Sequence, residues 1–204
     1  LLGTMIVAEG ELAEACRERD GFVIGEGAGF VVLERESFAQ ARGAPVLAEL
    51  AGYGVTCDAY RITDERPDAA EAAHAISLGL RDAEMEPRDL GYINAHGTGT
   101  RMNDITETRA IRLSLGAHAA DVPVSSTKSM IGHLLAAAGA VELAATLIAL
   151  TEGFLPPTIN LEDPDEECDL DYVPNVARAA SPTAALSTSF GFGGQNACLV
   201  IRRW

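Results

Sequence analysis

The sequence predicts an α/β fold in which a sheet is covered by helices on both faces. Short apolar runs, typical of buried strands, alternate along the chain with stretches of helical periodicity. The strand-like runs are apolar at successive positions, which indicates burial on both faces of the sheet. No fixed-period repeat or low-complexity linker divides the 204 residues, so we expect one compact unit.

The N-terminal half is expected to contain three strands and two helices. The Gly-rich stretch 25–29 is expected to pack tightly before a buried strand at 30–33, and a short helix at 37–42 ends at Gly43. A second strand covers 46–53, and a third covers 91–95. The helix at 69–83 is amphipathic, with its apolar face formed by Ala69, Ala73, Ile76, Leu80 and Ala83.

The C-terminal half is expected to continue the alternation. Asp104 followed by Glu107 resembles a capping box, which predicts a helix that opens there and ends near Leu115. A strand at 122–125 and a loop at 126–131 follow, and 199–201 forms the last strand. An apolar helix begins at His133 and ends near Glu152. Its apolar run is short for a membrane span and carries Glu142, so we interpret it as a buried core helix.

Composition excludes several classes of function. The 15 Lys and Arg residues against 30 Asp and Glu residues give a net charge of −15, which disfavours nucleic acid and anionic membranes as partners. The four cysteines form no CxxC pair, which is typical of a reducing, cytoplasmic setting. No ligand cluster calls for a metal or another cofactor, and the acidic stretch 163–171 does not match a calcium loop, so we expect it to be solvated.

His96 is the first candidate for chemistry. It lies in the run NAHGTGT just past the end of a predicted strand, where ligands bind in open α/β sheets. The glycines on either side of Thr98 allow close backbone approach, and Thr98 and Thr100 offer hydroxyl groups beside it. A structural histidine in a turn remains an equal alternative from position alone.

His133 is the second candidate, together with Lys128. An imidazole at a helix N-terminus is favoured in its neutral form, in which it can donate a hydrogen bond to a developing oxyanion. Lys128 would favour the same neutral form if it lay close. Because an unpaired buried carboxylate is costly, Glu142 is the natural acid partner of Lys128. The alternative is a purely structural ion pair with His133 as a helix cap.

The Gly-rich run FGFGGQN at 190–196 is the third feature. Such a turn can aim backbone N–H groups at an anion, which makes Gly193 and Gly194 candidate substrate-binding residues. Phe192 could swing over a pocket. The run fails as a nucleotide-binding loop, because no Lys-Ser/Thr follows it and no GxGxxG opens a helix.

Taken together, these segments resemble the C-terminal half of the β-ketoacyl-acyl carrier protein synthases, which have the thiolase fold. From about residue 17 onward the resemblance is nearly continuous. It is carried by RDGFVIGEGAG at 19–29, CDAYRIT at 57–63, NAHGTGT at 94–100 with Asn103 and Asp104, SSTKSMIGH at 125–133, PPTINL at 156–161, DLDYVP at 169–174 and SFGFGG at 189–194.

This resemblance implies a decarboxylative Claisen condensation. In the family, a cysteine holds the acyl chain as a thioester, and two histidines assist malonyl decarboxylation and stabilise the enolate oxygen. His96 and His133 match those histidines by motif, and Lys128 matches the family lysine with Glu142 near it. Two neutral imidazoles suit an enolate as donors, and the reaction needs no metal.

Further roles follow from the same resemblance. Phe192 matches a gatekeeping phenylalanine whose backbone N–H helps to form the oxyanion hole, and Thr98 and Thr100 match hydroxyls that contact the phosphopantetheine arm. The implied partners are an acyl carrier protein and a second ketosynthase-like subunit, in a homodimer or a heterodimer. Carrier proteins are acidic, so docking needs a local cationic patch. The loop cations available for it are Arg61, Arg66 and Arg101.

The chain also departs from the family. Nothing in 1–204 resembles the surroundings of the nucleophilic cysteine, which belongs to the N-terminal half, and residues 15–18 replace the usual Arg-Pro-Phe/Trp-Asp segment. We therefore interpret 1–204 as a C-terminal thiolase-like domain that forms no acyl-enzyme alone: a fragment, a processed piece or one member of a split pair. None of its own cysteines is expected to be a catalytic thiol.

Two alternatives to an extending synthase have to be weighed. One is a non-catalytic partner of the chain-length-factor type, which has no need of both histidines. The other is a thiolase that uses coenzyme A, but no Cys-Gly-Gly motif is present near the C-terminus, where Cys198 follows the glycines. The retained histidines favour the synthase.

Overall fold

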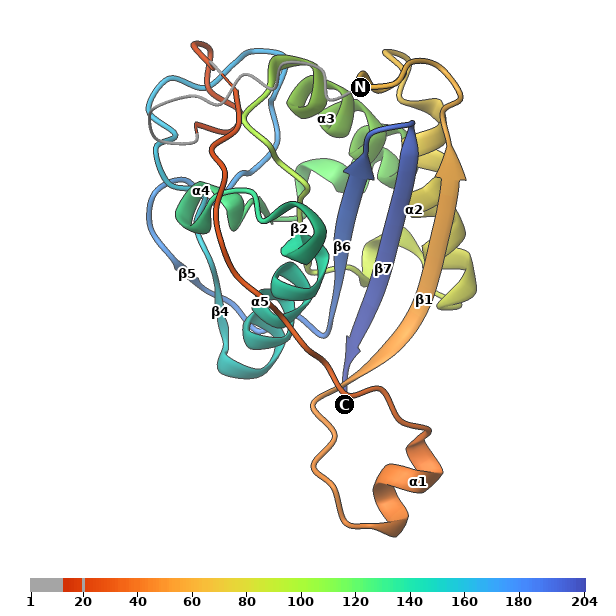
Figure 1. The fold of residues 1–204 in the computed structure, drawn as a ribbon. Helices are drawn as coiled ribbons and strands as arrows, with labels where there is room; N and C mark the ends of the chain where they lie inside the picture. Colours follow the sequence, from red (N-terminus) through yellow and green to blue (C-terminus); the bar gives the residue numbers. More distant parts are fainter. Residues whose placement is uncertain (1–12, 20) are drawn as a thin grey trace.

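The computed structural model describes residues 13–19 and 21–204, and its centre is a five-stranded mixed sheet (Figure 1). The order across this sheet is β1 (Ala48–Cys57), β7 (Gln195–Arg203), β6 (Ala184–Gly191), β2 (Tyr92–Asn94) and β3 (Val124–Ser125). β7 is antiparallel to β1 and β6, whereas β6, β2 and β3 are parallel. β1, β2, β3 and β6 therefore end at the same edge of the sheet. A second, two-stranded sheet pairs β4 (Phe154–Leu155) with β5 (Arg178–Ala179).

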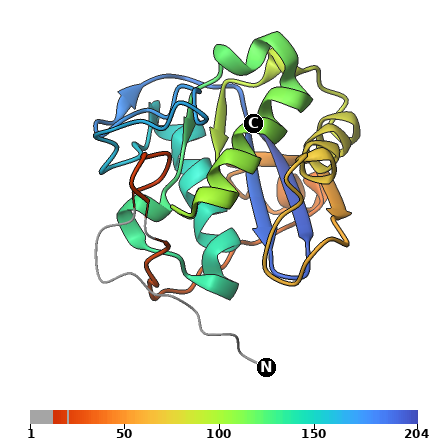
Figure 2. The same ribbon diagram turned by 90° about the horizontal axis from the view of Figure 1, so that it is seen from above.

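Helices cover both faces of the main sheet, which confirms the predicted α/β class. α2 (Ala70–Asp82) and α3 (Arg101–Leu115) pack on one face and α5 (Ala138–Glu152) on the other (Figure 1, Figure 2). Two buried apolar clusters follow from this layering, and neighbouring residues of β6 divide between them: Leu186 belongs to the α2–α3 cluster and Ala185 to the α5 cluster. The short helices α1 (Glu36–Ala41) and α4 (Lys128–Ile131) complete the set of α-helices in the described residues.

Several predicted elements are confirmed with shifted ends. The helix expected at 69–83 is α2, and the one at 37–42 is α1. The strands expected at 46–53, 91–95, 122–125 and 199–201 lie within or across β1, β2, β3 and β7. The loop expected at 126–131 contains α4, which the sequence did not predict. Asp20 and the first twelve residues lie outside the described residues.

β6 was missed altogether, although it is the strand between β2 and β7. Its apolar run is interrupted by Ser187, Thr188 and Ser189, so it shows neither a continuous apolar stretch nor an alternating pattern. The three side chains are buried or half-buried in the structure. Polar side chains buried in this way are expected to form hydrogen bonds inside the fold.

The predicted buried strand at 30–33 is wrong for this structure. Phe30 is 96% exposed and Val32 is 83% exposed, and these residues form no strand. A strand needs a neighbour for its backbone N–H and C=O groups, and the main sheet already ends at β1 and β3. The segment instead runs down past α5 to the small lobe that holds α1 (Figure 1).

The capping box predicted at Asp104 and Glu107 is also wrong. α3 begins at Arg101, with Thr100 as its N-cap residue, so both acids lie inside the helix. Each of the two residues is 2% exposed. Their carboxylates bind backbone N–H groups of distant segments rather than those of their own helix end.

The apolar helix predicted from His133 begins later and is less buried than expected. α5 starts at Ala138, after a short 3-10 turn at Leu135–Ala137, and five of its fifteen residues are buried. In the described part of the chain, Leu135–Glu152 is long and apolar enough to cross a membrane by length and composition, and 28% of it is buried. Beside α5, the face of β1 that carries Leu50, Tyr53 and Val55 is exposed.

The acidic stretch 163–171 is not simply solvated. Asp165, Glu167 and Asp169 form ion pairs at 2.6–2.8 Å with Arg19, Arg109 and Arg112 respectively. Two of these arginines lie on α3, so the stretch is fastened to that helix.

A glycine contact between β1 and α2 gives the first testable prediction. A Cβ atom at Gly54 would lie 1.9 Å from the carbonyl oxygen of Ala75 on α2. Gly54→Ala is therefore expected to force the helix away from the strand and to lower the free energy of unfolding by about 3 kcal/mol, as overpacked cores do. Urea unfolding measures the change. Gly139→Ala on α5 is the matched control and should not destabilise, because a Cβ there would come no closer than 3.8 Å, to Ser189 Oγ.

Candidate active site

The two candidate histidines lie at the edge of the sheet where the parallel strands end. His96 follows β2 after one intervening residue, and Lys128 is the first residue of α4. His133 comes two residues after α4, beyond Gly132, whose φ of +74° allows the chain to turn there. Glu142 projects from α5 toward Lys128.

His133 is held by an extended segment and not by a helix start, which corrects the sequence prediction. Its backbone N–H donates to the Val23 carbonyl oxygen at 2.7 Å, and its own carbonyl oxygen accepts from Gly25 N at 3.1 Å. The chain can approach this closely because Gly25 has no side chain: a Cβ there would lie 2.1 Å from the Ile131 oxygen. The tight packing predicted for 25–29 is thereby confirmed.

The imidazole rings of His96 and His133 face each other edge to face. Their centroids are 5.4 Å apart, with an interplanar angle of 86°. Phe190 lies against the His96 ring at 5.8 Å, and Phe22 lies against the His133 ring at 5.5 Å. The two histidines therefore form one site with apolar walls.

Lys128 contacts both His96 and Glu142 in this site. Its ammonium group is buried and contacts the Glu142 carboxylate, as the sequence predicted. The same nitrogen donates to the His96 carbonyl oxygen at 2.5 Å and lies 3.2 Å from His96 Nδ1. One lysine therefore neutralises a buried acid and fixes both the backbone and the ring of His96.

These contacts determine the tautomer of each ring. An ammonium group only donates, so His96 Nδ1 accepts the hydrogen bond from Lys128. His133 Nδ1 likewise accepts from the backbone N–H of Leu135 at 3.1 Å. Each neutral ring then carries its proton on Nε2. Both histidines can donate one hydrogen bond from Nε2.

Both imidazoles are neutral at pH 7. Burial first, and then the Lys128 charge, holds the pKa of His96 well below its usual value. The same two causes, in the same order, lower the pKa of His133 to about 4. The sequence predicted the neutral form of His133 from a helix dipole, but α5 begins five residues later, so the causes are burial and Lys128.

A titration tests this electrostatic description. Because the folded pKa of His133 is about 4 and its usual value is 6.5, the folded protein takes up no proton there between pH 7 and pH 5. The contribution of this group to stability is complete above pH 6.5 and is lost as the pH falls toward 4. NMR of the His133 ring is expected to show the neutral form at pH 5. Protonation near pH 6 would contradict the assignment.

Glu107 is a site residue whose role the sequence did not reveal. Its Oε1 accepts the His96 N–H at 2.8 Å, and its Oε2 accepts the Gly97 N–H at 2.8 Å. Thr188, on β6, donates its hydroxyl to Oε1 at 2.6 Å. The sequence analysis could interpret the Glu107 carboxylate only as a helix cap, because its actual partners lie at least ten residues away in the chain.

Glu14 was also missed. A Cβ atom on Gly97 would lie 2.3 Å from the Glu14 carboxyl carbon, so Glu14 packs directly under the His96 loop. Burial first, and then Asp104 and Glu107, raises the pKa of Glu14 well above its usual value. The raised pKa of Glu14 favours its neutral form, which lessens the repulsion among these three buried acids.

The remaining predicted site residues differ in their hydrogen bonding and exposure. The hydroxyls of Thr98 and Thr100 are 2.8 Å from each other. Phe192 is 60% exposed at the turn between β6 and β7. The N–H groups of Gly193 and Gly194 donate to the carbonyl oxygens of Ile62 and Gly191, so neither is a free donor in this structure.

The three arginines predicted as loop cations do not form a free cationic patch, and Arg101 is the first residue of α3 rather than a loop residue. Arg61 pairs with Asp64 at 3.0 Å, Arg66 with Asp68 at 2.8 Å, and Arg101 with Glu167 at 3.8 Å. All these side chains are substantially exposed, so the pairs can exchange partners.

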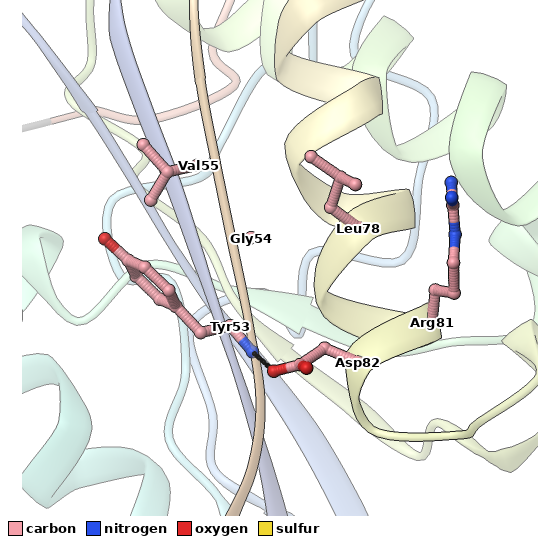
Figure 3. A pocket seen from close by; sticks show the side chains of 6 residues that line it. All are labelled: Tyr53, Gly54, Val55, Leu78, Arg81 and Asp82. Carbon is pink, nitrogen blue, oxygen red and sulfur yellow. Dashed lines mark hydrogen bonds between the residues drawn. The ribbon is translucent and has the colours of Figure 1, made fainter.

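A surface hollow lies elsewhere, between β1 and α2 (Figure 3). It is lined by Tyr53, Gly54, Val55, Leu78, Arg81 and Asp82, none of which is a predicted site residue. Within it, Asp82 accepts the Tyr53 N–H at 3.0 Å, which caps one backbone donor at the free edge of β1. The hollow is a feature of the sheet edge and not part of the histidine site.

Comparison with known proteins identifies what this arrangement is similar to. Residues 47–162 match the family described as "Beta-ketoacyl synthase, C-terminal domain". The chain is 54% identical over 188 residues to 3-oxoacyl-[acyl-carrier-protein] synthase 2 of Synechocystis sp., covering 92% of this chain and 45% of that protein. It is 52% identical over 187 residues to the tetracenomycin polyketide synthase ketoacyl synthase alpha subunit of Streptomyces glaucescens, covering 92% and 44%.

Solved structures agree with these relatives. A type II polyketide ketosynthase in complex with its acyl-carrier protein matches with a TM-score of 0.93 and 43% identity, over 95% of this chain and 48% of that one. The ishigamide ketosynthase/chain length factor matches with a TM-score of 0.92 and 40% identity, over 97% and 48%. The predicted thiolase-like fold is thereby confirmed. The chain spans a little under half the length of the curated relatives it matches.

Proposed function

This chain belongs to the β-ketoacyl synthase family, and we propose that it supplies the two-histidine part of the active site of a β-ketoacyl-acyl carrier protein synthase. The reaction is the decarboxylative condensation of malonyl-acyl carrier protein with an acyl chain held on the enzyme. The observation that carries the proposal is a pair of neutral imidazoles, the buried ring of His96 and the half-buried ring of His133, with centroids 5.4 Å apart and each proton on Nε2.

The chemistry follows from these two donors. When the bond between the malonyl carboxylate and the central carbon breaks, CO2 leaves and the electron pair moves into the thioester, which becomes an enolate. The negative charge gathers on the thioester oxygen. Two N–H donors at that oxygen stabilise the charge, and because both rings are already neutral no proton has to be removed first. His96 and His133 are assigned this role.

The second half of the reaction needs a cysteine that holds the acyl chain as a thioester and then leaves as a thiolate. The enolate carbon attacks the carbonyl of an enzyme-bound acyl thioester, a new C–C bond forms, and a cysteine thiolate leaves. In the described part of the chain, no recorded hydrogen bond of the four thiols involves His96 or His133. The acyl-holding cysteine is therefore assigned to the part of the synthase that this chain does not span.

The exposed apolar surface supports that division. Leu50, Tyr53 and Val55 on β1, Ile148 on α5, and the extended segment with Phe30 are all exposed. Large apolar side chains exposed on neighbouring elements in this way are typical of an interface. We assign it to contact with the remainder of the synthase, which would cover α5 and provide neighbours for the backbone of 30–33.

The direct test is a condensation assay with the complete synthase that contains this chain. With acyl- and malonyl-carrier proteins as substrates, mass spectrometry is expected to find a carrier-bound β-ketoacyl chain two carbons longer than the primer, with one CO2 released per extension. Carrier-protein binding without CO2 release would contradict the proposal.

A second candidate is a partner subunit of the chain-length-factor type. It is favoured by the similarity to the ishigamide ketosynthase/chain length factor. Such a partner would assemble with a ketosynthase but would not need donors at His96 and His133. Full decarboxylation by an assembly in which both histidines are replaced would support this alternative.

A further inference from the structure

Thr188 contacts the His96 site from the central strand β6. Its side chain is fully buried, in the row of β6 side chains that faces α2 and α3. The other members of that row are Ala184, Leu186 and Phe190. A hydroxyl in an otherwise apolar row must be hydrogen-bonded, because a buried unpaired polar group is costly.

The hydrogen-bond partners of this hydroxyl all lie in the segment that contains His96 or contact that segment. Thr188 Oγ1 lies 2.6 Å from Glu107 Oε1, 3.1 Å from the backbone nitrogen of His96 and 3.4 Å from the Asn94 carbonyl oxygen. A carboxylate only accepts, so the hydroxyl donates to Glu107 and its lone pair accepts the His96 N–H. That N–H is shared between Thr188 and Glu107.

The hydrogen bonds among Thr188, Glu107 and the His96 N–H hold His96 at the point where the strand pairing of β2 ends. Ala95 N still donates to the Ser125 oxygen as in a parallel ladder, but the His96 N–H goes to side chains instead of a neighbouring strand. Phe190, two residues beyond Thr188, lies against the His96 ring. β6 thus contacts the backbone of His96 through one residue and its imidazole through another.

We propose that Thr188 is a positioning residue for His96, acting through its hydroxyl on the Glu107 carboxylate and the His96 N–H. This inference rests on the proposed function for its kinetic consequence, but the geometry that it describes can be measured separately. Without the hydroxyl, Glu107 loses a short donor and the His96 N–H keeps Glu107 as its one acceptor. The imidazole then leaves its place against Lys128 and His133.

The kinetic test compares Thr188→Val with Thr188→Ser in the complete synthase. Valine keeps the shape and removes the hydroxyl, so kcat for malonyl-acyl carrier protein decarboxylation is expected to fall roughly 10- to 100-fold, as for misplaced catalytic groups. KM is expected to stay unchanged, because the buried side chain meets no substrate. Serine is expected to restore kcat. Thr106→Val is the matched control, since this buried hydroxyl on α3 has no hydrogen-bond partner in the described part of the chain.

Hydrogen–deuterium exchange provides a readout that does not depend on activity. The amides of His96 and Gly97 are expected to exchange at least about 10-fold faster in Thr188→Val, and at the wild-type rate in Thr188→Ser and Thr106→Val. Unchanged exchange and unchanged kcat in Thr188→Val would overturn the inference, and so would equal losses in the valine and serine variants. If the wild-type synthase releases no CO2, the proposed function fails, and the exchange rates alone decide the role of Thr188.

Discussion

Replacing either His96 or His133 by alanine is expected to lower malonyl-acyl carrier protein decarboxylation by about 10²- to 10³-fold in the complete synthase, the usual effect of removing one oxyanion donor. Each ring offers a single Nε2 proton, and the rings lie 5.4 Å apart, so neither can replace the other. The initial rate of CO2 release measures the effect. Because both donors act on the same oxygen, the double variant should be little worse than either single one.

His74→Ala is the control for this prediction. His74 lies on the outer side of α2 and is exposed, and its Nδ1 is 3.8 Å from the Glu71 carboxylate. Its replacement should leave CO2 release at the wild-type rate. Near-normal release by both His96→Ala and His133→Ala would mean that the synthase assignment is wrong for this chain.

Lys128→Met is expected to have the largest effect on stability, lowering the free energy of unfolding by about 3–5 kcal/mol. The substitution leaves the Glu142 carboxylate buried without its counter-charge, and burial already raises the pKa of this group. The His96 carbonyl oxygen also loses its donor. Urea unfolding at pH 7 measures the loss.

A second substitution separates charge from packing at this site. In the double variant Lys128→Met with Glu142→Gln, no unpaired charge remains, so the loss of stability is expected to be smaller than for Lys128→Met alone. Arg61→Met, which breaks the exposed pair with Asp64, should produce no measurable change. A double variant as unstable as the single one would show that the buried charge is not the cause.

The centre of the candidate site could be predicted from the sequence because local motifs carry it. His96, Lys128 and His133 stand in short runs next to strand and helix ends, and the low tolerance of apolar surroundings for charge pointed to Glu142 as the partner of Lys128. The structure places Lys128 in contact with both His96 and Glu142. What the sequence could not supply is the tautomer of each ring, which depends on contacts with Lys128 and Leu135.

The errors have a common physical origin in long-range contacts. Glu107 and Asp104 looked like a capping box because their real partners, the N–H groups of His96, Gly97 and Ala15, lie far away in the sequence. β6 was hidden by three consecutive polar residues, of which Thr188 forms its hydrogen bonds with residues of distant segments. The strand predicted at 30–33 has the composition of a buried strand, but it pairs with no strand in the described part of the chain and its side chains are exposed.

The supporting role of β6 illustrates the same point. The strand propensity of Thr188 is favourable but says nothing of its partners, which come from the meeting of β2, β6 and α3. Hydrophobic periodicity alone shows only a polar residue in a segment with a weak strand pattern. The structure shows a hydroxyl shared by the backbone and the carboxylate that fix His96.

Malonyl decarboxylation is expected to depend on His96 and His133 of this chain and not on the acyl-holding cysteine. CO2 release from malonyl-acyl carrier protein by the complete synthase, with that cysteine replaced by alanine, tests this dependence. We expect CO2 release to persist in this variant and to be lost when His96→Ala or His133→Ala is added. Release that disappears with the cysteine, or that survives the loss of both histidines, would contradict it.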